Sequence, residues 1–438
     1  MNKRLADIEL KVLDRLIGRF VKVTDADRRK EIVMATARTV EPGITADEVN
    51  QIFESMNTLY PIDKYATSDT IEDVMINNTK NIFVYDTDKG SVKTEDTIPD
   101  REALDLFVKK LRLYATNESA HGNVMDVHMP TGNRVNIVSS PLGYDITMRN
   151  FKKRTLSIID LINSGELDYQ IAARLWVYMD GFAVRPANLL IGGMPASGKT
   201  TLLNAMFSFI RPEERIVTIE ETYELNTETQ ENCARLETSE QLPMEELVKN
   251  ALRMRPDMII IGETRGKEAN DMITAMNIGK IVISTIHAST ARDVVNRLQH
   301  APMNVPLEMV SVVDGIIITA QVFKDRKPIR KVTQMSEISG VETQVLLSDL
   351  YKFDYKTFAS APILPSITYR DTISKVIGVL PQDILAEESV RAAMLLAMNK
   401  HGIRDMKSIS ETVRAYYDNP EATLAKLGLN NLMPVIRR

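Results

Sequence analysis

Residues 188–200 read Asn-Leu-Leu-Ile-Gly-Gly-Met-Pro-Ala-Ser-Gly-Lys-Thr, an apolar run that leads into a glycine-rich loop. Within it, Gly193–Thr200 has the spacing G-x-x-x-x-G-K-T, and a second apolar stretch, residues 201–207, follows. A strand, a loop of this spacing and a helix, in that order, form the phosphate-binding loop of many nucleotide-binding proteins. The sequence therefore predicts an α/β fold that binds a nucleoside triphosphate.

Each part of this loop has a chemical role in that prediction. The glycines let successive backbone N–H groups turn toward phosphate oxygens, and the helix that follows adds the positive end of its dipole. Lys199 supplies a positive charge between the outer phosphates, and Thr200 is the natural hydroxyl ligand of Mg²⁺. The residues expected to bind the nucleotide are Gly193, Ala196, Ser197, Gly198, Lys199, Thr200 and Thr201.

Length and composition exclude several classes of protein. A chain of 438 residues is too long for one core, so two or three domains are expected. The net charge of -5, from 54 basic and 59 acidic residues, gives no overall positive field, and we expect no nucleic acid as the main partner. The single cysteine, Cys233, excludes a disulfide framework and favours a reducing compartment. No apolar stretch approaches 18 residues, so we expect neither a membrane span nor secretion of the protein.

The spacing of apolar residues changes along the chain and predicts four segments. Residues 1–66 carry apolar residues at helical spacing, and residues 67–151 mix short β-rich runs with one helix, which predicts a helical element followed by an α+β domain. In residues 152–350, strand candidates alternate with helical stretches, which is typical of a mostly parallel sheet covered by helices. Residues 351–438 are expected to form a helical C-terminal region. The strand candidates of the third segment are 215–220, 258–261, 281–285 and 315–320.

Two of these apolar runs end in carboxylates. The run Met-Ile-Ile-Ile-Gly ends in Glu263, which is the form of a Walker B element, where one acid acts on Mg²⁺ or its water at the edge of the sheet. The run that begins at Ile216 ends in Glu220, Glu221 and Glu224, which repel one another unless a cation or a proton lies among them. At least one of these acids is expected to polarise the attacking water. The alternative interpretations are a strand-end surface glutamate and a solvated acidic turn.

A third run, residues 281–286, places His287 at the same edge of the sheet. An imidazole there can hydrogen-bond the γ-phosphate and report its loss, although an isolated histidine is more often structural. Arg253, Arg255 and Arg265 flank the Walker B run. They are candidates for neutralising phosphate charge in this or an adjacent subunit, and pairing with surface glutamates is an equally good interpretation.

In this order, the loop and the three strand ends resemble the secretion-superfamily ATPases that power type II and type IV secretion, type IV pili and the archaeal flagellum. The matching elements are Gly193 to Thr200, the acidic box Ile219 to Glu224, the Walker B segment Arg255 to Arg265 and the histidine box Ser284 to Ala288. The resemblance covers roughly residues 70–350. Residues 71–78, 132–137 and 146–151 look like the N-terminal domain of the family, and the helical tail is similar to archaeal members.

The resemblance implies a RecA-like ATPase domain, ATP and Mg²⁺ as cofactors, and a homohexameric ring in which an N-terminal domain closes over the bound nucleotide. Arginines in such rings reach the phosphates from the N-terminal domain or a neighbouring subunit. Arg134 and Arg149 match the positions of those arginines and are carried over as catalytic residues. His287 is carried over in the same way.

The acidic box departs from the family pattern. Many relatives have Glu-Asp where this chain has Glu220-Glu221, and the extra methylene leaves open which acid is the catalytic base. Glu224 with Glu263 is the first choice, and Glu221 ranks third. Thr200 and Glu263 are the expected Mg²⁺ ligands, and no zinc is predicted because the chain lacks the four-cysteine cluster of some assembly ATPases.

The leading functional hypothesis is a cytoplasmic hexameric motor ATPase, peripheral at the inner face of the cell membrane. It would convert hydrolysis into domain motion against a polytopic membrane platform protein, and so assemble, retract or turn a pilus-like filament or drive protein secretion. Two alternatives stay open at this point. One is a nucleic-acid-moving ATPase of the conjugation type, and the other is a nucleotide-gated scaffold with little turnover.

Overall fold

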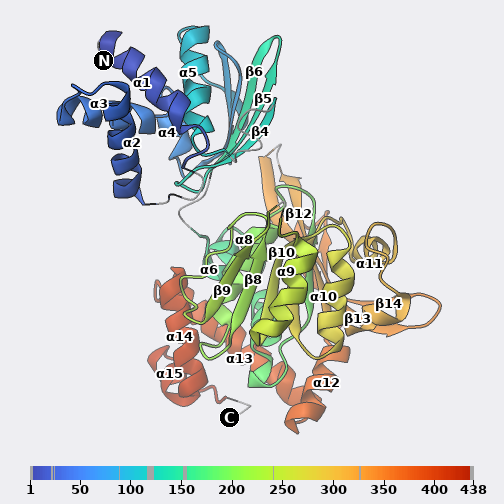
Figure 1. Ribbon diagram of the computed structural model, residues 1–438. Helices are drawn as coiled ribbons and strands as arrows, with labels where there is room; N and C mark the ends of the chain where they lie inside the picture. The colour runs from blue at the N-terminus through green and yellow to red at the C-terminus, as the bar shows by residue number, and fades with distance from the viewer. Residues whose placement is uncertain are drawn as a thin grey trace. The chain divides into compact units, whose positions relative to one another are not determined.

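The computed structural model describes residues 3–20, 23, 25–87, 89–115, 123–150, 155–239, 241–324 and 327–434. These residues divide into two compact units, Met1–Arg154 and Thr155–Arg438 (Figure 1). Each unit has hydrophobic clusters of its own, one in the first unit and two in the second. Each unit therefore has the core that an independent domain requires.

The first unit combines five helices with a six-stranded antiparallel sheet of order β3-β2-β1-β6-β5-β4. The third helix begins with a capping box, because the Thr45 hydroxyl and the Glu48 carboxylate each accept a backbone N–H there. The helices are α1 (Lys3–Leu16), α2 (Ala26–Val40), α3 (Ala46–Asn57), α4 (Asp63–Ala66) and α5 (Arg101–Arg112). The strands are β1 (Ile71–Asn78), β2 (Asn81–Asp86), β3 (Gly90–Lys93), β4 (Val124–His128), β5 (Arg134–Ser140) and β6 (Gly143–Arg149).

The second unit is built on a nine-stranded sheet of order β15-β14-β13-β12-β7-β11-β10-β8-β9. The six strands from β12 to β9 are parallel, and the other three are joined to them by antiparallel pairs. This strand order confirms the predicted α/β class with a RecA-like, mostly parallel sheet. The strands are β7 (Leu189–Gly193), β8 (Ile216–Glu220), β9 (Cys233–Glu237), β10 (Met258–Thr264), β11 (Ile281–Ile286), β12 (Gly315–Lys324), β13 (Lys327–Val341), β14 (Val345–Asp354) and β15 (Ala359–Pro362).

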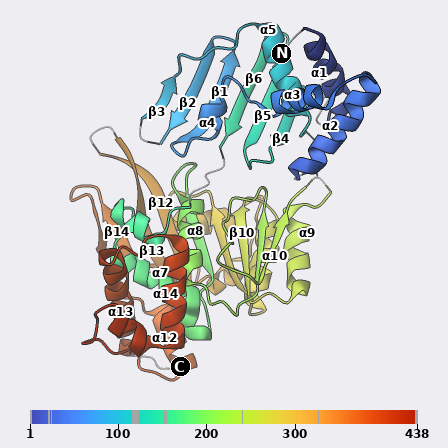
Figure 2. The same cartoon turned by 90° about the vertical axis from the view of Figure 1, so that its left-hand side faces the viewer.

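Helices cover both faces of this sheet, because successive residues of its central strands are apolar and point to opposite sides (Figure 2). Met258 and Ile260 join one cluster, whereas Ile259 and Ile261 join the other. One cluster includes α6 (Ile158–Asn163), α7 (Tyr169–Asp180) and α8 (Lys199–Met206), and the other includes α9 (Met244–Ala251), α10 (Glu268–Asn277) and α11 (Ala291–Gln299). Short 3₁₀ helices lie at Gly181–Ala183, Phe207–Phe209, Leu252–Met254 and Leu307–Val312.

The C-terminal helices begin later than the sequence suggested. They start at Thr368 rather than at residue 351, because β14 and β15 first extend the sheet by two antiparallel strands. Among the described residues, no helix combines the length and the apolar character that crossing a bilayer requires. The C-terminal helices are α12 (Thr368–Ile377), α13 (Pro381–Lys400), α14 (Met406–Asp418) and α15 (Pro420–Lys426).

Candidate nucleotide site

The carboxyl ends of four neighbouring parallel strands, β7, β11, β10 and β8, meet at one edge of the sheet. The phosphate loop follows β7, His287 follows β11, Glu263 lies near the end of β10 and the acidic box follows β8. In open α/β sheets, ligands bind outside this edge of the strands. The four motifs, which span about 95 residues of sequence, are thus presented together.

The phosphate loop has the backbone geometry that its glycines allow. Gly198 is the N-cap of α8 and has a φ of 99°, a conformation that side chains other than glycine rarely adopt. A Cβ at Gly198 would also lie 2.9 Å from Oε1 of Glu166. A hydrogen bond of 2.9 Å between the buried hydroxyls of Ser197 and Thr319 also connects the loop to β12. Thr200 and Thr201 lie in the first turn of α8.

The ammonium of Lys199 is held over the loop by main-chain carbonyls. Its Nζ donates to the oxygens of Gly193 at 2.9 Å and Met194 at 3.3 Å. It also lies 3.5 Å from Nδ1 of His287. Burial lowers the pKa of Lys199, and the carboxylate of Glu263 works against that shift. These weak acceptors leave the ammonium available for a stronger anionic partner, since hydrogen bonds between ionised groups are the strong ones.

A chain of charged side chains continues from His287 across the strand ends. Nε2 of His287 lies 2.5 Å from Oε1 of Glu263, and Arg265 donates to Oε2 of the same carboxylate at 2.7 Å. A second nitrogen of Arg265 lies 3.4 Å from Glu221. Burial, followed by the charge of Lys199, lowers the pKa of His287, so the imidazole is neutral at pH 7. The ring thus lies between Lys199 and Glu263, with Nδ1 toward the ammonium and Nε2 toward the carboxylate.

The three acids after β8 separate into different roles. Glu220 is buried, and its Oε1 accepts the backbone N–H groups of Glu224 and Leu225, each at 2.8 Å. Burial raises the pKa of Glu220 to about 7. Glu221 is exposed and pairs with Arg265, and Glu224 is exposed. Glu220 therefore shapes the turn, and it leaves Glu221 and Glu224 facing solvent as candidates for the base.

Some predicted residues lie elsewhere. Arg134 and Arg149 belong to the unit Met1–Arg154, where they face each other across β5 and β6, and Arg149 is 3.2 Å from Asp73. Their contact with a nucleotide stays a prediction. Arg253 and Arg255 precede β10 and are exposed at the end of the strand opposite Glu263. Their positions fit surface residues better than residues that neutralise phosphate charge.

The sequence did not reveal the residues that support the loop from other elements. Glu166, between α6 and α7, is buried against Gly198, and burial raises its pKa to about 7 although Arg330 and Lys331 lower it. Arg330 on β13 donates from Nε to the carbonyl of Ala196 at 3.1 Å. These residues stand more than 25 positions from the loop and form no local pattern, so no signal in a single sequence points to them.

Comparison with known proteins places the chain in a family. A sequence profile described as "Type II/IV secretion system protein" matches residues 60–343. The chain belongs to this family. The match covers the phosphate loop, the acidic box, Glu263 and His287, together with the strands β1 to β6 of the first unit.

Several known proteins are similar to the chain over long stretches. Uncharacterized protein MJ0900 of Methanocaldococcus jannaschii is 30% identical over 437 residues, which cover 93% of this chain and 77% of that protein. MJ0781 of the same organism is 39% identical over 225 residues, 48% of this chain and 31% of that protein. The probable conjugal transfer protein TrbB of Sinorhizobium fredii is 32% identical over 196 residues, 44% of this chain and 58% of its own length. The chain thus spans less than two thirds of MJ0781 and of TrbB.

Two solved structures are also similar to the chain. The VirB11 ATPase of the Brucella suis type IV secretion system is 22% identical, covers 64% of this chain and 93% of its own, and has a TM-score of 0.34. The pilus retraction motor PilT with bound ADP is 17% identical, covers 80% of this chain and 95% of its own, and has a TM-score of 0.47.

Proposed function

We propose that this secretion-family protein is a motor ATPase that hydrolyses ATP with Mg²⁺ and couples hydrolysis to movement of its N-terminal domain. It acts as a homohexamer at the inner face of the cell membrane, against a polytopic platform protein of a secretion or pilus-like system. The observation that carries the proposal is the continuous chain Lys199, His287, Glu263 and Arg265 beside the phosphate loop.

The residues present fit Mg²⁺ and ATP. A Cβ at Gly193 would lie 2.6 Å from Oγ1 of Thr319 and closer still to Oγ of Ser197, so the close turn of the loop requires glycine. Among the described residues, the hydrogen-bond partners of Lys199 are carbonyl oxygens and an imidazole. Mg²⁺ in such sites is held by one or two protein oxygens and by phosphates, and Thr200 and Glu263 are the candidates here. When bound, ATP supplies the phosphoanhydride bond whose hydrolysis provides the free energy.

The roles of the protein groups follow from their positions. Lys199 neutralises phosphate charge, and Thr200 and Glu263 hold Mg²⁺. An exposed acid of the box, Glu224 before Glu221, accepts the proton of the attacking water together with Glu263. Neutral His287 bridges Lys199 and Glu263, so a change at the γ-phosphate is transmitted to the Walker B carboxylate.

Arg134 and Arg149 are proposed to bring positive charge to the phosphates from the first unit. That unit would close over ATP and open again after hydrolysis. The difference in affinity for ATP and ADP between the two states would thereby drive mechanical work.

The test is release of phosphate from Mg²⁺-ATP together with binding of a fluorescent ATP analogue. Lys199→Ala is expected to lose binding and turnover, and Glu263→Gln to keep binding while turnover falls by about 10²-fold or more. Arg253→Ala, at the far end of β10, is the matched control and should behave as the unchanged protein. Normal turnover in both site variants would contradict the assignment, and sedimentation in the presence of ATP tests the hexamer.

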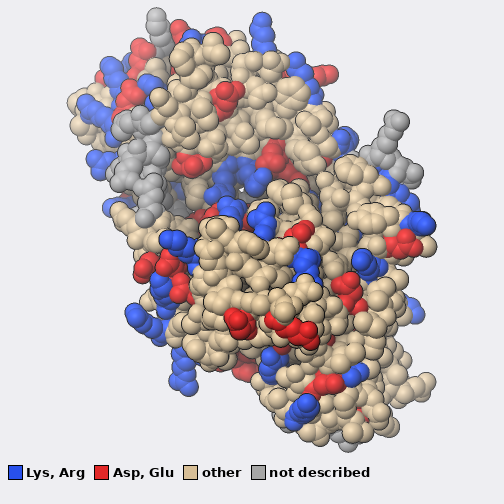
Figure 3. All heavy atoms as spheres, turned by 90° about the vertical axis from the view of Figure 1, so that its right-hand side faces the viewer, with Lys and Arg blue, Asp and Glu red and all other residues tan. Residues whose placement is uncertain are grey.

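Similarity to the conjugal transfer protein TrbB favours one second candidate, an ATPase of a conjugation-type system. The net charge of -5 argues against direct work on DNA, and basic and acidic side chains are interspersed on the face of Thr155–Arg438 drawn in Figure 3. Stimulation of ATPase activity by DNA, lost as salt is raised, would support this candidate. A scaffold with little turnover would instead show no single-turnover hydrolysis.

A further inference from the structure

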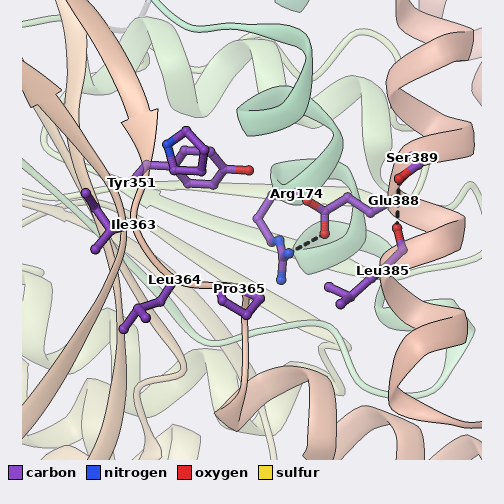
Figure 4. A pocket seen from close by; sticks show the side chains of 9 residues that line it. Arg174, Tyr351, Ile363, Leu364, Pro365, Leu385, Glu388 and Ser389 are labelled. Atoms are coloured by element: carbon purple, nitrogen blue, oxygen red, sulfur yellow. Dashed lines mark hydrogen bonds and ion pairs between the residues drawn. The ribbon is translucent and has the colours of Figure 1, made fainter.

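A pocket of about 430 Å³ opens on the second unit among residues that take no part in the nucleotide site. It is bordered by Tyr351 of β14 and by the segment 362–365, which begins at the last residue of β15. The other border is formed by Leu385, Glu388 and Ser389 of α13. Arg174 of α7 forms its floor, and Figure 4 shows the guanidinium pointing to the middle of this ring of residues. Its volume is that of a small binding site.

The floor carries a buried charge with unused donors. Arg174 is 3% exposed and forms an ion pair with Glu388, which is 5% exposed. That pair uses one terminal nitrogen of the guanidinium, while Nε and the second terminal nitrogen have no hydrogen-bond acceptor among the described residues. Buried donors without acceptors are rare and destabilising, so they point to a group that the isolated chain does not supply.

The rim of the pocket is apolar and open to solvent. Ile363 and Leu364, which line it, are 54% and 45% exposed. Ile367, Val376 and Leu380 follow as exposed large apolar side chains, so five of them fall within 18 residues. Scattered exposed apolar residues are normal, whereas a concentration beside a pocket marks a surface that another molecule covers.

We propose that this pocket binds a short segment of a partner protein that carries a large apolar side chain beside a carboxylate. The apolar side chain packs between the rim and Leu385, and the carboxylate accepts the free donors of Arg174. Guanidinium donors prefer carboxylates to neutral acceptors, which selects an acidic rather than an amide side chain. The site adds a docking point to the proposed motor and does not depend on ATP hydrolysis.

The test uses two fluorescein-labelled peptides, Gly-Leu-Phe-Asp-Gly and its twin Gly-Leu-Phe-Asn-Gly, and measures fluorescence anisotropy with the full chain. The acidic peptide is expected to bind about tenfold more tightly than the amide twin, the effect of one charge-assisted hydrogen bond. Replacing both partners by Arg174→Met with Glu388→Met avoids an unpaired buried charge and should abolish this preference while the chain stays folded.

A rim variant keeps the proposal falsifiable even if the double variant fails to fold. Leu364→Glu, at an exposed position, should weaken binding of both peptides about tenfold or more, whereas Ile278→Glu, which is also exposed and lies at the end of α10, should not. Equal binding of the two peptides, or binding of neither, overturns the proposal. A change of sedimentation caused by Leu364→Glu in the absence of peptide also overturns it, because the occupant would then be a second copy of the chain.

Discussion

Two clusters of charged side chains in Thr155–Arg438 differ in the groups that they leave available to a ligand. At the strand ends, Glu263, Arg265 and His287 are partly exposed, and Lys199 is satisfied by weak acceptors. In the interior, Arg391 of α13 donates to Asp180 at 2.6 and 3.2 Å and to Glu387 at 3.1 Å. The first cluster can exchange its partners for a ligand, and the second cannot.

The interior cluster is buried and satisfied from several elements. Asp180 is 0% exposed and Arg391 is 2% exposed. Tyr416 of α14 donates to Glu387 at 2.8 Å, and Arg211 lies 3.4 Å from Asp180. The cluster therefore ties α7, α13 and α14 together, and it shows that a dense group of charges is not by itself a functional site. Incomplete bonding at an accessible strand end is the better indicator.

The largest expected effect tests this contrast by stability. Arg391→Leu leaves Asp180 and Glu387 buried without their cation, and we expect a loss of about 3–5 kcal/mol in the free energy of unfolding. Arg265→Leu removes the corresponding arginine from the strand ends, where exposed pairs contribute about 1 kcal/mol or less. Denaturant unfolding followed by circular dichroism measures both. Equal losses for the two variants would remove the distinction between the clusters.

The next effect concerns the ligand. Mg²⁺-ATP at 100 times its Kd should raise the free energy of unfolding by about 2.7 kcal/mol, because it binds only the folded state. Lys199→Ala should abolish this protection, while Lys249→Ala, a surface lysine of α9, should retain it. Thermal unfolding with and without nucleotide measures the difference. Full protection of Lys199→Ala would mean that the nucleotide binds elsewhere.

Local patterns predicted most of the nucleotide edge. The apolar runs before Glu220, Glu263 and His287 are long, buried and bounded by polar residues, so their strands could be located. In contrast, β9 reads Cys-Ala-Arg-Leu-Glu at the edge of the sheet and has no apolar run. The antiparallel strands β13 to β15 were also missed, since polar residues interrupt them and each is stabilised by pairing with its neighbours in the sheet.

The supporting residues could not be predicted for a different reason. Glu166, Thr319 and Arg330 act through contacts with the loop that exist only in the folded chain. The same holds for Arg174, whose helix α7 is buried from Ile171 to Asp180 and gives no sign that it borders a pocket. Sequence patterns report neighbours along the chain, whereas these residues depend on neighbours in space.

Glu166 provides a pH test, because it shares features of both clusters. It is buried like the interior acids, yet it lies against the phosphate loop, and its pKa is raised to about 7 from about 4.5. Between these values the folded chain binds more protons than the unfolded chain, so stability falls as pH rises from about 4.5 to 7. Glu166→Gln should reduce this fall by about 2–3 kcal/mol. Denaturant unfolding across that pH range measures it.

Two outcomes decide the Glu166 prediction. Glu246→Gln, on the exposed side of α9, is the matched control and should leave the pH dependence unchanged. A Glu166→Gln variant with the full fall in stability would show that the carboxyl of Glu166 does not titrate in this range, and that other groups cause the pH dependence.

The smallest expected effect concerns the hydroxyl pair Ser197 and Thr319. The pair is neutral, and it is buried and hydrogen-bonded like the interior cluster, but it contributes to the phosphate loop through Ser197. Thr319→Val keeps the shape and leaves the Ser197 hydroxyl without this partner, which costs about 1 kcal/mol and should weaken ATP binding about fivefold. Adding Ser197→Ala removes both hydroxyls and should cost little more than either change alone, since neither group is then left unpaired. Titration of a fluorescent ATP analogue into the three variants measures the coupling. If the two changes simply add, the hydroxyl pair does not order the loop, and the loop relies on Lys199 and its glycines alone.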